Sequence, residues 1–132
     1  CALCYALVDL KRRTVTLANS GVPYPIRVSE GACSLIELPG VPLGSFFGVS
    51  YDEVTFPLFI DDVFVFCSDG VTEAMNAGGE EFTSDRLMAV VAAAKDLSAA
   101  EIVSRIVSAV EEHRAGSPPN DDSTIVVLRI TA

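Results

Sequence analysis

Residues 61–73 read DDVFVFCSDGVTE and join a short apolar run to an abrupt polar end. The run, residues 63–67, is rich in β-branched and aromatic side chains and is bounded by turn-forming residues. This pattern is typical of a strand buried on both faces rather than of a helix. Asp69 follows the strand, and Gly70 allows a sharp exit of the backbone. A carboxylate on such a rigid platform suits a hard divalent cation. The alternative is that Asp69 only caps the start of a short helix.

The composition limits the classes of function. The chain has 132 residues, half of them hydrophobic, which fits one domain or a part of one. Eighteen acidic residues against nine Lys and Arg give a net charge of −9. This charge argues against a nucleic-acid partner, because phosphate backbones are bound by basic patches, and the basic run at residues 11–13 falls in a predicted turn. No apolar run is long enough to span a bilayer, so no membrane insertion is expected.

The four cysteines are not spaced as a zinc site. Cys1 and Cys4 lie in a strand-like run, where residues three apart face opposite sides. Cys33 and Cys67 are isolated from each other, so the cysteines are expected to be small buried hydrophobic residues. No signal peptide is visible, which makes a reducing cytoplasm the default location, although residues preceding Cys1 could include one.

Strand-like segments dominate the first half of the chain and helical ones the second. The expected strands are residues 1–10, 14–19, 26–28, 34–38, 54–58, 63–67 and 123–130. One helix is expected at residues 83–95, with Leu87, Val90, Val91 and Ala94 on one face. A capping box, Ser98 with Glu101, opens another helix that runs to Arg114. Its expected buried stripe is Ile102, Val103, Ile106, Val107 and Val110. This order indicates an α+β layered domain of antiparallel strands, with helices covering one face of a sheet.

A second acidic segment, PPNDDST at residues 118–124, leads into the last strand. The adjacent carboxylates of Asp121 and Asp122 repel each other, and a nearby cation would offset that repulsion. The alternative is an ordinary turn with solvated acids. If the last strand lies beside residues 63–67, then Asp69 and Asp121 reach the same edge of the sheet, as a divalent metal site requires.

Several segments together resemble a known family. In chain order they are LANSGVPYPIRV (17–28), PLGSFFGVSYDEV (42–54), DDVFVFCSDGVTEA (61–74), GGEEF (78–82) and NDDSTIVVLRI (120–130). The ordered set resembles the bacterial metal-dependent Ser/Thr protein phosphatases, and more narrowly the SpoIIE-like branch of the type 2C (PPM) superfamily. The resemblance covers essentially the whole chain. It implies an αββα fold, in which two antiparallel sheets form a sandwich flanked by helices, with two Mn²⁺ or Mg²⁺ ions at one edge.

The resemblance also implies a mechanism. A metal-bound water attacks phosphoserine or phosphothreonine directly, so no side chain acts as the nucleophile and no phosphoenzyme forms. By position, Asp69 and Asp121 are expected to be ligands of one metal. The residues expected to support them, by orienting a ligand or bracing its loop, are Asp122, Gly70, Thr72 and Glu73.

The chain departs from the family pattern in two places. Family members carry an upstream Gly-Asp motif, whose carboxylate bridges the two metals, and the helices of the opposite layer; this sequence has no counterpart of either. Where the branch usually has a histidine, this chain has Val22. Residues 1–132 are therefore expected to be a single, N-terminally incomplete phosphatase domain that forms at most one metal site and is weak or inactive as a fragment. Its uncovered sheet face predicts a dimer or a swapped oligomer.

The resemblance further implies a place in bacterial signalling. The expected substrate is a phosphorylated protein of the anti-sigma-factor antagonist type, and sensory or receiver domains are expected upstream in the full chain. Two alternatives stay open at this point. One is a non-catalytic, partner-binding module of the same fold, because the bridging acid is missing. The other is a plain α+β interaction domain whose acids only form turns.

Overall fold

The computed structural model describes residues 1–132 and contains seven strands and three helices. The strands are β1 (Leu3–Asp9), β2 (Thr14–Ser20), β3 (Ile26–Ser29), β4 (Ala32–Leu35), β5 (Glu53–Pro57), β6 (Val63–Cys67) and β7 (Ile125–Arg129). The helices are α1 (Asp69–Thr72), α2 (Thr83–Ala93) and α3 (Ala99–Arg114), all placed between β6 and β7 in the chain. None of these helices is long and apolar enough to cross a membrane.

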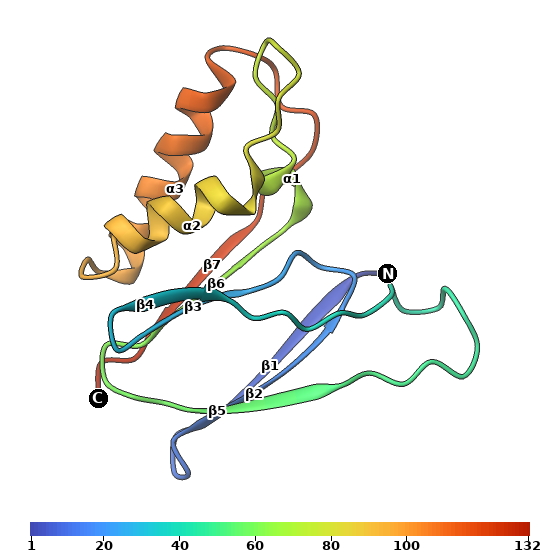
Figure 1. Ribbon diagram of the computed structural model, residues 1–132, viewed down its shortest axis with the longest axis vertical. Coiled ribbons are helices and arrows are strands. Elements are labelled where there is room, and N and C mark those ends of the chain that lie inside the picture. Colours follow the sequence, from blue (N-terminus) through green and yellow to red (C-terminus); the bar gives the residue numbers. More distant parts are fainter.

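The strands form two antiparallel sheets. One sheet has the order β1-β2-β5 and the other β4-β3-β6-β7. The sheets face each other, and α2 and α3 lie on the far side of the four-stranded sheet, where they contact β4 and β7 (Figure 1). This arrangement confirms the expected sandwich of antiparallel sheets with helices flanking it.

Strand β6 lies between β3 and β7 and is buried on both faces, as its apolar run predicts. Successive side chains of a strand point to opposite faces. Val63, Val65 and Cys67 therefore join the core beneath the helices. Phe64, which is fully buried, joins the smaller core between the two sheets. The position of β6 at the boundary of both cores makes its C-terminal end a rigid platform.

Helix α3 begins at the capping box expected from the sequence. The Ser98 hydroxyl accepts a hydrogen bond from the Glu101 amide at 3.2 Å, and the Glu101 carboxylate accepts one from the Ser98 amide at 2.9 Å. These bonds lower the pKa of Glu101. The buried stripe includes Ile102, Ile106 and Val110, but Val107 is 46% exposed, so its predicted burial is wrong. Residue 107 is rotated about 100° around the helix from residue 106, which carries it out of the stripe.

Strand β4 begins two residues earlier than expected, at Ala32 instead of Ser34. The turn before it contains only Glu30 and Gly31, with φ angles of 52° and 80°. A two-residue turn with both φ angles positive matches the twist of the flanking strands and leaves Ala32 in register with Ser29. Ile36 and Leu38, which gave the predicted strand its apolar pattern, leave the sheet and pack between the two sheets instead.

The predicted burial is confirmed for Cys67 and is wrong for the other three cysteines. Only Cys67 is buried, while Cys4 and Cys33 are partly exposed and Cys1 is exposed; all four are free thiols. The difference follows from topology, because Cys1 precedes the edge strand β1, whereas Cys67 ends the central strand β6.

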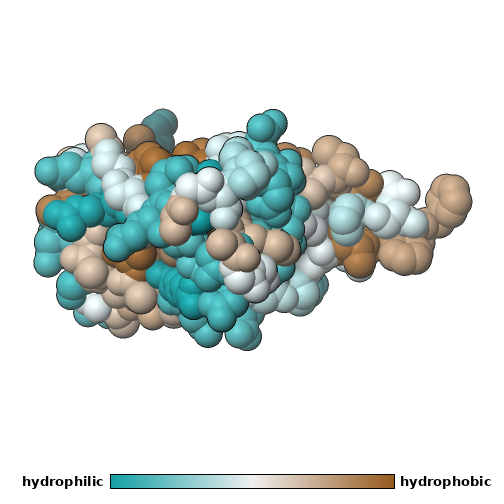
Figure 2. Space-filling view, turned by 90° about the horizontal axis from the view of Figure 1, so that it is seen from above, coloured by the Kyte–Doolittle hydropathy of each residue, from teal (hydrophilic) through white to brown (hydrophobic).

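Two apolar surfaces are exposed. Leu3, Tyr5 and Leu7, on the outer face of β1, are 50%, 50% and 53% exposed. Phe46 and Phe47 lie in the loop between β4 and β5, which projects from the body as an apolar protrusion (Figure 2). The expectation that an uncovered sheet face leads to dimerisation or exchange of elements stays a prediction.

Candidate metal centre

Antiparallel pairing of β6 and β7 decides where the two acidic segments meet. The last registered pair of this ladder joins Cys67, at the end of β6, to Ile125, at the start of β7. Asp69 follows the first of these residues, and Asp121 and Asp122 precede the second, so both segments come to the same edge of the sheet. This is the placement on which the sequence-based metal hypothesis depended.

The two acidic segments lie in direct contact. The Ser68 amide donates to the Thr124 carbonyl at 3.0 Å, which extends the ladder by one pair. A Cβ atom on Gly70 would lie only 2.0 Å from the carbonyl oxygen of Asp122. Only glycine permits this approach of one backbone to the other. The predicted role of Gly70, keeping the loop after β6 tight, thus has a steric basis.

Asp69 is the first residue of α1, and Ser68 occupies the N-cap position before it. The alternative prediction, that Asp69 is the helix cap, is therefore wrong, because Ser68 is the N-cap. Asp69 follows the cap and lies in the first turn, where a negative charge is favoured by the partial positive charge of the helix start. Its side chain is exposed and free to bind something other than its own helix.

The carboxylates of Asp69, Asp121 and Asp122 are exposed, and none of them takes part in the five ion pairs of the chain. One oxygen of Asp121 accepts a 2.7 Å hydrogen bond from the Asp122 amide, which leaves its other oxygen free. No group of three or more His, Cys, Asp or Glu side chains is arranged to hold a metal. The donors fit a hard cation of the Mg²⁺ type, which is commonly held by one or two carboxylates together with water and phosphate oxygens.

The other two predicted support residues each make one hydrogen bond near Asp69. The Thr72 hydroxyl donates to the Asp69 carbonyl at 3.4 Å and so closes the single turn of α1. The side-chain amide of Asn120 donates to the Glu73 carbonyl at 3.4 Å, which joins the end of α1 to the segment before β7. Thr72 is thus bonded within α1, and only Glu73 is bonded to the segment before β7.

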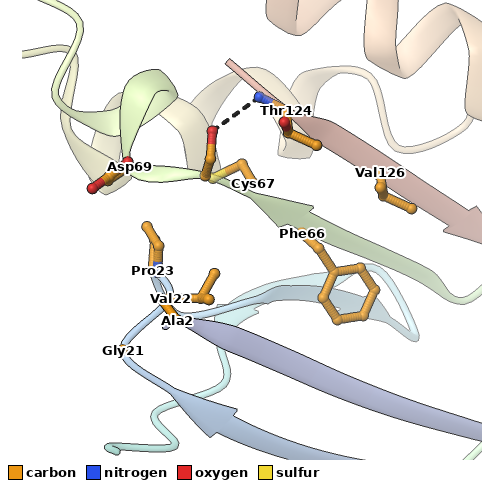
Figure 3. Close-up of a pocket in the computed structure, with 10 residues that line it drawn as sticks. Ala2, Gly21, Val22, Pro23, Phe66, Cys67, Asp69, Thr124 and Val126 are labelled. Carbon is orange, nitrogen blue, oxygen red and sulfur yellow. Dashed lines mark hydrogen bonds between the residues drawn. The ribbon is translucent and has the colours of Figure 1, made fainter. Parts of the chain in front are cut away.

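A pocket of about 280 Å³ opens beside Asp69, between the ends of the two sheets (Figure 3). Its walls are mainly apolar and include Val22, Pro23, Phe66 and Val126. Ser68, Asp69 and Thr124 form its polar end. Val22, the position where the resemblance leads one to expect histidine, therefore lines the same pocket as the candidate ligand Asp69.

The model of the family described as Stage II sporulation protein E (SpoIIE) matches residues 1–131. The chain belongs to the SpoIIE family. No curated protein matches it. Its fold is that of PP2C-type phosphatase domains.

Solved structures support this fold assignment. The SiaA PP2C domain of Pseudomonas aeruginosa is 20% identical with a TM-score of 0.84, and the match covers 98% of this chain and 51% of that one. The phosphatase domain of Bacillus subtilis SpoIIE, presoaked with Mn, is 18% identical with a TM-score of 0.78, and the match covers 98% of this chain and 56% of that one. The Mycobacterium tuberculosis phosphatase PstP is 14% identical with a TM-score of 0.70, and the match covers 99% of this chain and 60% of that one. Another PstP structure contains two manganese ions. This SpoIIE-family chain spans a little over half the length of these domains.

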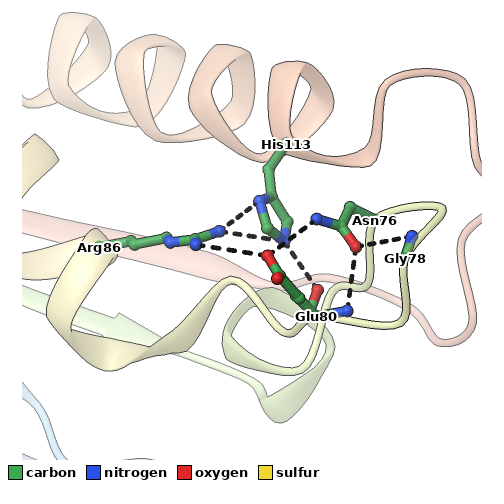
Figure 4. A network of polar contacts seen from close by, with 5 residues as sticks. All are labelled: Asn76, Gly78, Glu80, Arg86 and His113. Carbon is green, nitrogen blue, oxygen red and sulfur yellow. Dashed lines mark hydrogen bonds and ion pairs between the residues drawn. The ribbon is translucent and has the colours of Figure 1, made fainter.

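The loop that follows α1 is held by a polar network that the sequence did not indicate (Figure 4). Asn76 accepts hydrogen bonds from the amides of Gly78 and Glu80, at 3.0 and 2.9 Å, and so shapes the loop. Arg86 lies 2.6 Å from Nδ1 of His113, whose Nε2 lies 2.9 Å from the Glu80 carbonyl. Through these contacts the His113 ring links α2, α3 and this loop.

Burial and the charge of Asp69 raise the pKa of the Cys67 thiol from its ordinary value near 9 to about 11, with burial as the larger cause. Since the thiolate is the reactive form, Cys67 is expected to resist iodoacetamide at about pH 8, whereas the exposed Cys1 reacts. The labelled peptides can be identified by mass spectrometry. Unfolding in guanidinium should make Cys67 as reactive as the others. Labelling of native Cys67 as fast as Cys1 would contradict the packing of the end of β6.

Sequence reasoning overlooked two serines at this centre, Ser68 and Ser123. Each lies next to an acidic residue at a strand end, and its hydroxyl bonds to the opposite segment. The one available signal was the presence of a hydroxyl residue beside the acid in both segments. A serine in a turn is so common that this signal identifies no partner.

Proposed function

We propose that this SpoIIE-family chain forms part of a metal-dependent protein phosphatase that hydrolyses phosphoserine or phosphothreonine on a bacterial signalling protein. The observation that carries the proposal is the meeting of the two acidic segments, which bear Asp69 and Asp121, at one edge of the sandwich. Their carboxylates are exposed and unpaired with any basic side chain.

Charge supports a role for cations at this edge. A phosphate ester is an anion, and a chain with net charge −9 that presents free carboxylates would repel it. A bound divalent cation reverses the local sign and lets acidic residues take part in binding phosphate. Mn²⁺ or Mg²⁺ bound there would lower the pKa of water and neutralise charge on the phosphoryl group.

The residues of this chain have distinct tasks in the proposal. Asp69 and Asp121 supply oxygen ligands from two loops, and Asp122 adds negative charge beside them. Gly70 lets the loops touch, and Thr72 closes the turn that carries Asp69. The pocket beside Asp69 is open to solvent at the same edge, and we propose that the substrate segment around the phosphorylated residue enters there.

The substrate follows from the family resemblance rather than from any residue of the pocket. We propose a phosphorylated protein of the anti-sigma-factor antagonist type, with sensory or receiver domains in the same chain as regulators. The apolar pocket beside Asp69 suits a side chain next to the phosphorylated residue, because apolar walls with a few polar groups are typical of binding sites.

The test is a phosphatase assay on the protein as its gene encodes it, with a phosphoserine peptide as substrate. We expect turnover with Mn²⁺, loss of turnover when EDTA removes the metal, and recovery when Mn²⁺ is added back. Calorimetric titration with Mn²⁺ measures binding separately. Binding without turnover would favour a non-catalytic module of the same fold, and the absence of both would leave only an interaction domain.

A further inference from the structure

The geometry points to Ser68 and Ser123 as positioning residues that hold the two metal-binding segments at a fixed separation. This inference rests on the proposed function, since it concerns the same centre. The bonds that carry it lie just past the end of the β6–β7 ladder, whose last pair is Cys67 and Ile125. Beyond that pair, one more backbone bond joins the Ser68 amide to the Thr124 carbonyl, and side-chain hydroxyl groups make further bonds between the two segments.

The Ser68 hydroxyl joins two backbone groups of the opposite segment. It accepts a hydrogen bond from the Thr124 amide at 2.9 Å, the bond drawn in Figure 3. It also donates to the Asp122 carbonyl at 3.3 Å. A hydroxyl has one proton to donate and lone pairs to accept, so both bonds can form at once. One side chain thus holds the backbone of residues 122–124.

Ser123 makes the corresponding bond in the other direction. Its hydroxyl donates to the Gly70 carbonyl at 3.2 Å. Ser68 and Gly70 flank Asp69, so the backbone on both sides of Asp69 is bonded to the segment that carries Asp122. The missing Cβ of Gly70 is what allows this contact, because the Asp122 carbonyl occupies the space that a Cβ would need.

An ordinary capping role does not explain Ser68. Serine at an N-cap normally accepts a hydrogen bond from an amide in the first turn of its helix. Ser68 is the N-cap of α1, yet its side chain makes no such bond. Its hydroxyl is turned instead toward residues 122 and 124, which are more than fifty positions away in the chain.

These neutral hydrogen bonds oppose the electrostatic repulsion between the two acidic loops. Asp69, Asp121 and Asp122 are like charges at one edge, and without a cation they favour separation of the loops. Hydroxyl-to-backbone bonds hold the loops together without adding charge that would compete for the carboxylates. The backbone of the two loops is therefore held in place before metal binds, which reduces the ordering cost of binding.

The test measures the affinity of the protein, as its gene encodes it, for Mn²⁺ alone, by titration calorimetry or by the electron paramagnetic resonance of free Mn²⁺. We expect Ser68→Ala and Ser123→Ala each to weaken binding by about tenfold, the scale seen when residues that orient metal ligands are lost. Ser68→Thr keeps a hydroxyl at this position, where the backbone is extended, and should bind Mn²⁺ more tightly than Ser68→Ala. Ser104→Ala is the control, because the Ser104 hydroxyl bonds only within α3.

The outcomes separate this inference from the proposed function. If wild type binds Mn²⁺ and both alanine variants bind it equally well, the positioning role is wrong and the metal site stands. The role is also wrong if Ser68→Thr is as weak as Ser68→Ala. If wild type binds no Mn²⁺, the proposed function and this inference fall together. Thermal unfolding of each variant is measured alongside, and if Ser68→Ala does not fold, the result for Ser123→Ala decides.

Discussion

Replacing Asp69 with asparagine is expected to reduce Mn²⁺-dependent hydrolysis of a phosphoserine peptide by more than about a hundredfold. Loss of residues that merely orient metal ligands commonly costs about ten- to a hundredfold, and loss of a ligand itself should exceed that range. The substitution keeps the size of the side chain and removes its charge, so the cation loses a strong ligand while the shape of the edge is preserved. The quantity to measure is kcat/KM over a series of Mn²⁺ concentrations.

The thermal stability of Asp69→Asn without metal should be unchanged or slightly higher than that of wild type. Asp69 is exposed and belongs to no ion pair, and its charge adds to the repulsion among the acids at the edge. The melting temperature without metal should therefore stay at the wild-type value or rise slightly. Asp96→Asn, in the exposed turn between α2 and α3, is the matched control and should leave kcat/KM unchanged. Wild-type turnover by Asp69→Asn would remove the basis for the proposed function.

Replacing Asp62 with asparagine is expected to lower the free energy of unfolding by about 3 kcal/mol or more, the cost of breaking a buried ion pair by removing one partner. Asp62 is only 1% exposed. It accepts hydrogen bonds from the Ser29 hydroxyl at 2.6 Å, the Phe59 amide at 3.1 Å and the Arg27 guanidinium at 3.3 Å. An asparagine turns one acceptor into a donor that faces other donors.

The loss also leaves the Arg27 charge uncompensated. Arg27 lies over the ring of Phe56 at 4.6 Å and donates to the Pro57 carbonyl, so it connects β3 of one sheet to β5 of the other. Its Nε atom is already buried without a partner. The pair of Arg27 and Asp62 thus helps to hold the two sheets against each other. Disrupting it should destabilise the packing between them.

The neighbouring acid provides the control for this measurement. Asp61 pairs with Arg129 at 2.9 Å, but its side chain is 72% exposed. An exposed pair of this kind is worth at most about 1 kcal/mol, so Asp61→Asn should change stability little. Guanidinium unfolding of both variants gives the comparison. Equal losses for the two substitutions would mean that the burial of Asp62 has no energetic consequence.

Local signals predicted much of the fold. The apolar run of residues 63–67 identified the central strand, because no other element buries so many β-branched and aromatic side chains in so short a length. The capping box of Ser98 and Glu101 marked the start of α3 to the residue. Both features are short-range, so nearby residues contain all the information needed to recognise them.

Errors arose where a residue's environment is set by distant partners. Ile36 and Leu38 have the pattern of strand residues, yet they pack between the sheets. The two-residue turn before β4 makes the strand begin at Ala32, and it ends at Leu35, before these residues. Nothing in the sequence indicated that Asp62 is buried, because the Arg27 and Ser29 side chains that bond to it come from a distant part of the chain. Sequence periodicity carries no record of such partners.

The sequence by itself determined which residues could bind a cation: acids placed after one strand and before another, in a chain whose ordered motifs resemble a phosphatase family. Only the tertiary structure decided that these segments touch. Their contact depends on β7 pairing with β6 in an antiparallel sense, after three helices have intervened in the chain. Strand pairing is a long-range choice made by packing of the whole sheet, and for that reason the bonds from Ser68 and Ser123 became visible only in the folded molecule.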